Sequence, residues 1–63
     1  IENEALQKLY GMSLKSESSF VRWETIQLLK KDAEHLSFFK NQLQEMLTTE
    51  KSEEVKNAIS ELF

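Results

Sequence analysis

The sequence has 63 residues, of which 30% are charged and 40% hydrophobic, and a formal net charge of −3. A chain of this length forms one small domain at most and buries only about 60% of the surface that its unfolded form exposes. The acidic balance argues against tight binding to nucleic acid or to an anionic membrane, because both need a basic surface. With no cysteine and one histidine, disulfides and a closed zinc site are not expected. We therefore expect oligomerisation to supply stability, as it does for many small domains.

No apolar run reaches the length that spans a bilayer, and the first residues, IENEALQ, lack both an initiator methionine and the features of a signal peptide. We expect residues 1–63 to be a single small helical association domain, a fragment of a larger protein, with an intracellular location.

Apolar residues in the first ten positions recur at helical spacing and predict a short amphipathic helix: Ile1, Ala5, Leu6, Leu9 and Tyr10. Gly11, the only glycine, follows directly, and a glycine at this place predicts a left-handed C-terminal cap. The serine-rich segment 12–19 predicts a loop with Met12 and Leu14 beneath it, and Ser18 or Ser19 is expected to cap the next helix.

Residues Ser18–Thr49 contain neither glycine nor proline, and we interpret them as one long helix. Its apolar residues recur at the alternating three- and four-residue spacing of a coiled-coil seam, interrupted only by Lys40: Ile26, Leu29, Ala33, Leu36, Leu43 and Leu47. From Phe20 to Leu47 such a helix would extend roughly 42 Å, which is more than a small domain covers.

Further apolar residues widen this seam and occupy a second face of the predicted helix. Phe39 and Met46 lie beside the seam, and Val21, Leu28 and Phe38 lie on another side. A helix that is apolar on two faces needs two sets of neighbours. The chain's own short helices can cover one face, so we expect a second copy or a different protein to cover the other.

The end of the sequence predicts a short closing helix at Glu53–Phe63, after a hinge at Thr48–Ser52. Ser52 is a good N-cap, and the two acids that follow it favour the positive end of the helix dipole. The apolar residues then keep helical spacing: Val55, Ala58, Ile59, Leu62 and Phe63.

Residues that could carry chemistry are few, and we expect no enzyme activity, cofactor, small-molecule substrate or metal. Asp32 and His35 could offer two metal ligands on one helical face, but a di-metal site needs further carboxylates and a second histidine. His35 is better interpreted as a solvated or interface residue. Lys30, Lys31 and Arg22 could touch phosphate, although acidic residues outnumber basic ones by 11 to 8.

The aromatic residues have two interpretations, a peptide-binding groove or plain core. For Phe20 and Trp23 we expect core packing against Leu6, Leu9 and Tyr10. Phe38 and Phe39, near the middle of the long helix, are expected at an interface.

In its layout, a short helix, a long central helix and a closing helix, the chain resembles the self-associating C-terminal domain of the yeast telomere-length regulator of the Rif family. That resemblance implies a tetramerising module of a nuclear telomere protein, and no functional residue is carried over with it. The block RWETIQLLKKD at Arg22–Asp32 also resembles the tryptophan helix of FF domains, but that family's fold ends sooner after the block than this chain does.

The sequence therefore predicts an all-α fold, packed as a helical oligomer, whose function is homo-oligomerisation as a dimer or tetramer. The predicted interface lies on the long central helix: Ile26, Leu29, Ala33, Leu36, Phe39, Leu43, Met46 and Leu47. The alternative is a monomeric three-helix module that binds a helix or peptide of another protein. No contact with a membrane is expected, and the acidic composition disfavours a nucleic-acid partner.

Overall fold

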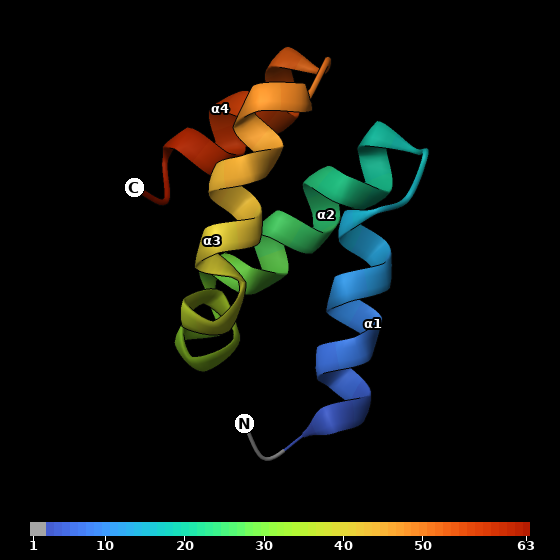
Figure 1. The fold of residues 1–63 in the computed structure, drawn as a ribbon, viewed down its shortest axis with the longest axis vertical. Coiled ribbons are helices and arrows are strands. Elements are labelled where there is room, and N and C mark those ends of the chain that lie inside the picture. Colours follow the sequence, from blue (N-terminus) through green and yellow to red (C-terminus); the bar gives the residue numbers. More distant parts are fainter. Residues whose placement is uncertain (1–2) are drawn as a thin grey trace.

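The computed structural model describes residues 3–63, and the regular elements among them are all α-helices. The predicted all-α class is confirmed, but the chain forms four helices where the sequence suggested three. They are α1 (Glu4–Leu14), α2 (Ser19–Lys30), α3 (Ala33–Thr49) and α4 (Glu53–Ser60). The second helix, α2, packs against each of the other three (Figure 1).

The predicted continuous helix over Ser18–Thr49 is wrong, because the chain leaves the helical conformation at Asp32 (φ −123°, ψ 82°). Its Oδ1 atom accepts the backbone N–H of His35 at 3.3 Å, as a helix N-cap does. Asp favours this position over a helix interior because its side chain competes for backbone hydrogen bonds. Consequently α2 ends at Lys30, and α3 starts a new direction at Ala33.

The carboxylate of Asp32 also ties this corner to α1. Its Oδ2 atom lies 3.2 Å from the Tyr10 hydroxyl, which donates to it, and 2.9 Å from Nδ1 of His35. The hydrogen bond from His35 is the main reason that the pKa of Asp32 is lowered from its ordinary 3.8. Burial, followed by the nearby Asp32 charge, raises the pKa of Tyr10. One side chain thus links α1, the end of α2 and the start of α3.

Because the chain reverses direction at Asp32, it forms a compact bundle of 32 × 23 × 17 Å in place of the predicted long helix. Its radius of gyration is 10.7 Å, close to the value of about 11 Å expected for a compact domain of this length. The core draws on all four helices: Tyr10, Leu14, Ile26, Leu29, Phe39, Leu43, Val55, Ala58 and Ile59. A single chain therefore covers its own core.

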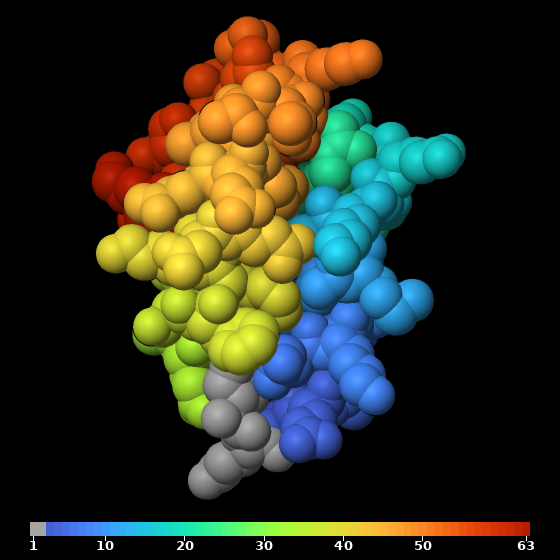
Figure 2. Space-filling model, viewed as in Figure 1, coloured from blue at the N-terminus to red at the C-terminus, as the bar shows by residue number. Residues whose placement is uncertain are grey.

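Helices α1 and α3 lie side by side on the face shown in Figure 2, where only parts of α2 reach the surface. The rings of Tyr10 and Phe39 meet edge to face, with centroids 6.2 Å apart. Phe39 also lies against Gly11, where an added Cβ would sit 3.7 Å from the ring. The predicted interface role of Phe39 is therefore replaced by a core contact within the chain.

The first helix does not stop where the sequence suggested. It continues through Gly11 to Leu14, and no residue in the range 3–63 has a positive φ. Leu14 is buried as expected, whereas Met12 is exposed. Ile1, the first residue of the predicted stripe, lies outside the described residues.

Two predicted helix starts are confirmed. The Ser18 hydroxyl accepts the backbone N–H of Val21, and the Ser52 hydroxyl accepts that of Val55, both at 3.3 Å. The closing helix is shorter than predicted and ends at Ser60. Within residues 3–63, none of the helices combines the length and the hydrophobicity that crossing a membrane requires.

Substitution of Gly11 by Ala tests whether α1 continues through this position. Because Gly11 lies within a helix and an added Cβ would make only ordinary van der Waals contact with Phe39, we expect Gly11→Ala to stabilise the fold by about 0.5–1 kcal/mol. Thermal unfolding followed by circular dichroism measures the change. A left-handed cap at Gly11 would give the opposite sign, a loss of about 1 kcal/mol.

Candidate functional site

Two adjoining hollows follow the boundary between α2 and α4, and we refer to them together as the α2–α4 groove. The first encloses about 280 Å³ and is lined by Ser19, Phe20, Trp23, Ser52, Glu54 and Val55. The second shares Trp23 and Glu54 with it and continues to Gln27, Asn57, Ala58 and Glu61. Small-molecule pockets usually enclose about 300–1,000 Å³, so the first hollow better suits one or two side chains of a partner.

The two helices that form the groove run in the same direction. Ser19 and Ser52, each at a helix start, line the same hollow, and Lys30 reaches Glu61 at 3.5 Å at the other end. Eight residues of α4 rise about 12 Å along the axis. The groove therefore has the length of about two turns of a partner helix.

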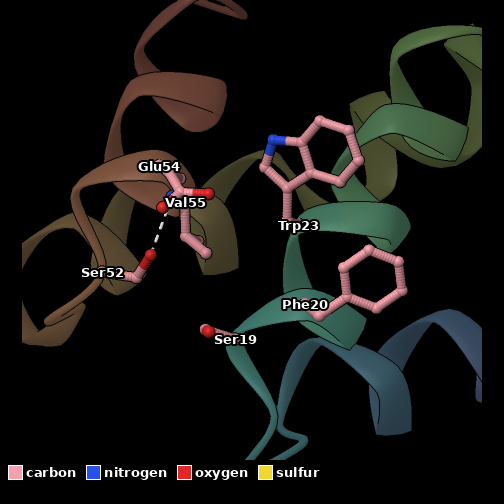
Figure 3. Close-up of a pocket in the computed structure, with 6 residues that line it drawn as sticks. All are labelled: Ser19, Phe20, Trp23, Ser52, Glu54 and Val55. Carbon is pink, nitrogen blue, oxygen red and sulfur yellow. Dashed lines mark hydrogen bonds between the residues drawn. The ribbon is translucent and has the colours of Figure 1, made fainter.

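An aromatic pair forms the α2 wall of the groove (Figure 3). The rings of Phe20 and Trp23 stack at an interplanar angle of 25°, with centroids 6.3 Å apart, and Phe20 is 66% exposed. Val55, on α4, lines the hollow opposite them. The predicted core position of Phe20 is wrong, whereas Trp23 does pack partly against the core. An exposed phenyl ring stacked on a tryptophan is typical of the anchors that dominate binding energies at interfaces.

The spacing of α2 and α4 at this end is set by an ion pair between Arg22 and Glu50. Two parallel hydrogen bonds join them, Nε to Oε1 at 2.9 Å and Nη2 to Oε2 at 2.8 Å. Nη1 of Arg22 also donates to the Ser16 carbonyl at 2.7 Å, and Glu50 accepts the backbone N–H of Ser52 at 3.0 Å. The pair thus holds the loop before α2 and the turn before α4 together.

The ion pair between Arg22 and Glu50 is largely shielded from solvent. The side chain of Glu50 is only 4% exposed and that of Arg22 is 18% exposed. Hydrogen bonds from Arg22 are the main cause of the lowered pKa of Glu50, and those to Glu50 raise the pKa of Arg22. Because both shifts favour the charged forms, the pair is ionised at neutral pH.

The charged rim of the groove is mainly acidic. Glu54 borders both hollows and Glu61 borders the second. Glu61 has the exposed pair with Lys30, whereas Glu54 forms no ion pair with another residue in the range 3–63. A ligand with positive charge is therefore favoured at this rim.

The residues predicted as an oligomer interface are not brought together on one surface. Four are core residues of the single chain, namely Ile26, Leu29, Phe39 and Leu43. Leu36, Met46 and Leu47 are partly buried against that core, and Ala33 is exposed at the start of α3. The bend at Asp32 explains the difference, because it folds the two halves of the predicted seam onto a shared interior.

The candidate metal ligands Asp32 and His35 do lie together, but they are hydrogen-bonded to each other, and Asp32 also accepts the Tyr10 hydroxyl. His35 is 5% exposed, so the expectation of a solvated or interface histidine is wrong. No group of three or more potential ligands among His, Cys, Asp and Glu occurs in residues 3–63. The bend residue itself had a sequence signal, because Lys30 and Lys31 precede Asp32 and Glu34 follows, the charge order of one helix ending and another beginning.

No family model, no curated protein and no solved structure matches this chain. The functional assignment therefore depends on the geometry of the groove.

Glu50→Gln tests the ion pair that holds the groove. We expect a loss of roughly 2 kcal/mol of stability at neutral pH, the size of a hydrogen bond to a charged group. Because the pKa of Glu50 is below its ordinary 4.5 in the folded state, the stabilisation is complete above pH 4.5 and is lost as pH falls through the folded pKa. The difference between wild type and variant should therefore shrink below that pH in urea titrations.

Glu53→Gln is the matched control, since Glu53 is 79% exposed and its pair with Lys56 spans 3.6 Å. This change should have an effect within about 0.5 kcal/mol. Equal effects of the two substitutions would contradict a special role for Glu50.

Proposed function

We propose that this chain is a protein-interaction module that binds a helix of another polypeptide in the α2–α4 groove. The observation that carries the proposal is the exposed Phe20 ring, stacked on Trp23 at the edge of a hollow whose far side is Val55. Leaving a large aromatic residue in water beside an open apolar hollow forgoes burial energy in the isolated chain. A partner side chain in the hollow recovers that energy.

A helix is the form of partner that best fits this groove. Its walls are two parallel helices, and its length of about two turns accommodates anchors spaced three or four residues apart. The described residues contain no strand whose edge could pair with an extended peptide. Peptide-binding modules that use grooves between helices work by the same arrangement of apolar anchors and a polar rim.

Homo-oligomerisation through a long central helix has less support. The seam that was to mediate it is divided at Asp32, and Leu29 and Leu43 are fully buried in one chain. Self-association as such stays a prediction, and it requires a different surface. Membership of a nuclear telomere protein stays a prediction of the resemblance.

Binding to nucleic acid is also less well supported than binding to a helix. Arg22, one of the three candidate phosphate contacts, is engaged with Glu50, and Lys30 lies beside Glu61. The remaining candidate, Lys31, provides too little positive charge for the salt-dependent contacts of such proteins.

Selection from a displayed library of randomised helical peptides tests the proposal. We expect enriched peptides to shift the emission of Trp23, the only tryptophan, and to lose at least about tenfold in affinity when Phe20 is replaced by Ala.

Phe38→Ala is the matched control for Phe20→Ala, because Phe38 is 52% exposed and lines neither hollow. It should leave the affinity unchanged. Peptides whose binding is weakened equally by both substitutions, or by neither, would show that the groove is not the docking site.

A further inference from the structure

A second exposed surface of the chain has the properties of a ligand for the groove. On the outer side of α1, Lys8 and Lys15 are exposed, with Leu9 and Met12 between them at 58% and 73% exposure. Neither lysine forms an ion pair with another residue in the described range. We refer to these four residues as the basic face of α1.

The charges of the two surfaces match in sign and in spacing. Lys8 and Lys15 are seven residues apart on or at the end of α1, and Glu54 and Glu61 are seven residues apart on or at the end of α4. Seven residues of helix rise about 10.5 Å, so both pairs of charges can meet at once.

Apolar groups accompany the charges on both surfaces. Met12 and Leu9 lie between the two lysines in sequence, and Phe20 and Trp23 form the wall beside Glu54. Methionine is flexible and makes favourable contacts with aromatic rings. A helix with this pattern is the kind of partner that the proposed function requires.

Resting on that proposed function, we propose that the occupant of the α2–α4 groove is helix α1 of a second copy of this chain. Lys15 of one copy pairs with Glu54 of the next, and Lys8 with Glu61. In this antiparallel orientation the negative end of the α1 dipole meets the positive end of α4. Glu61 shares its charge with Lys30, whose exposed 3.5 Å pair is weak.

The arrangement is head to tail and cannot form within one chain. Helices α1 and α4 lie on opposite sides of the molecule (Figure 1), so α1 does not occupy the groove of its own chain. Each copy therefore offers one helix and one groove. Contacts of this heterologous kind continue into open chains or close into rings.

The contact is small, because only about two helical turns enter the groove. Interfaces of this size lie at the lower end of specific complexes and are weak and reversible. Assembly is expected to increase over a concentration range from about 10 μM to about 1 mM. It should weaken with added salt, since the charges involved are exposed.

Charge reversal on each surface separately provides the test. One variant, Lys8→Glu with Lys15→Glu, retains the groove and reverses the charge of the basic face of α1. The other, Glu54→Lys with Glu61→Lys, retains the basic face of α1 and reverses the charge of the groove rim. All four side chains are exposed, so both variants should fold, as circular dichroism will verify.

Sedimentation equilibrium then reports the association. Wild type should show a mass that rises above 7.4 kDa with concentration, and each variant alone should stay at the monomer mass over the same range. An equimolar mixture should associate again, because the intact helix of one variant meets the intact groove of the other. Emission of Trp23 should shift in that mixture and in neither variant alone.

Other results would overturn the proposal. A wild-type mass of one chain up to about 1 mM, self-association of either variant at the wild-type strength, or a mixture that stays monomeric would each do so. Peptides from the library that still bind the groove in those circumstances would leave the proposed function intact and identify a different protein as its partner.

Discussion

The hydrogen bonds of the Asp32 carboxylate are the contacts on which the arrangement of the four helices depends. This carboxylate caps α3 through the backbone of His35, accepts the Tyr10 hydroxyl and lies against the His35 ring. These contacts reverse the chain where its apolar pattern would otherwise continue in one direction. The contacts between α2 and α4, and the pair between Arg22 of α2 and Glu50 at the end of α3, require that reversal.

The reversal also determines which apolar residues remain available for partners. Residues of the predicted seam, such as Leu29 and Leu43, are buried in the core of the single chain and are not available to a partner. The surface then includes an aromatic wall and acidic rim between α2 and α4 and a basic face on α1, besides separate exposed apolar residues such as Leu28 and Phe38. A chain of this size can thus be self-sufficient as a fold and still present two complementary surfaces.

Much of the secondary structure could be predicted from the sequence, because it depends on local chemistry. The caps at Ser18 and Ser52 and the apolar pattern of α4 follow from hydrogen-bonding groups and spacing within a few residues. The bend at Asp32 was missed because the heptad pattern runs through it and neither glycine nor proline interrupts the segment. One contact that favours the bend, the hydrogen bond from the Tyr10 hydroxyl, comes from a residue distant in sequence, although the charge order around Asp32 gave a local indication.

The candidate site was harder to predict than the helices. Phe20 and Trp23 were recognised as potential anchors but assigned to the core, since their partners on α4 become neighbours only after the chain has reversed. Gly11 was misassigned for a related reason: a glycine after an apolar stripe is typical of a helix end, yet here α1 continues past it against Phe39. Tertiary contacts decided both cases.

The distance between Glu17 and Lys51 tests the reversed chain most directly. The sequence has no cysteine, so spin labels can be attached at Glu17→Cys and Lys51→Cys, both exposed, and diluted with unlabelled protein for pulsed dipolar spectroscopy. Because Arg22 and Glu50 touch and the whole bundle is 32 Å long, a distance distribution centred below 32 Å is expected. A continuous helix over Ser18–Thr49 would place the labels about 50 Å apart, and that result would contradict the account.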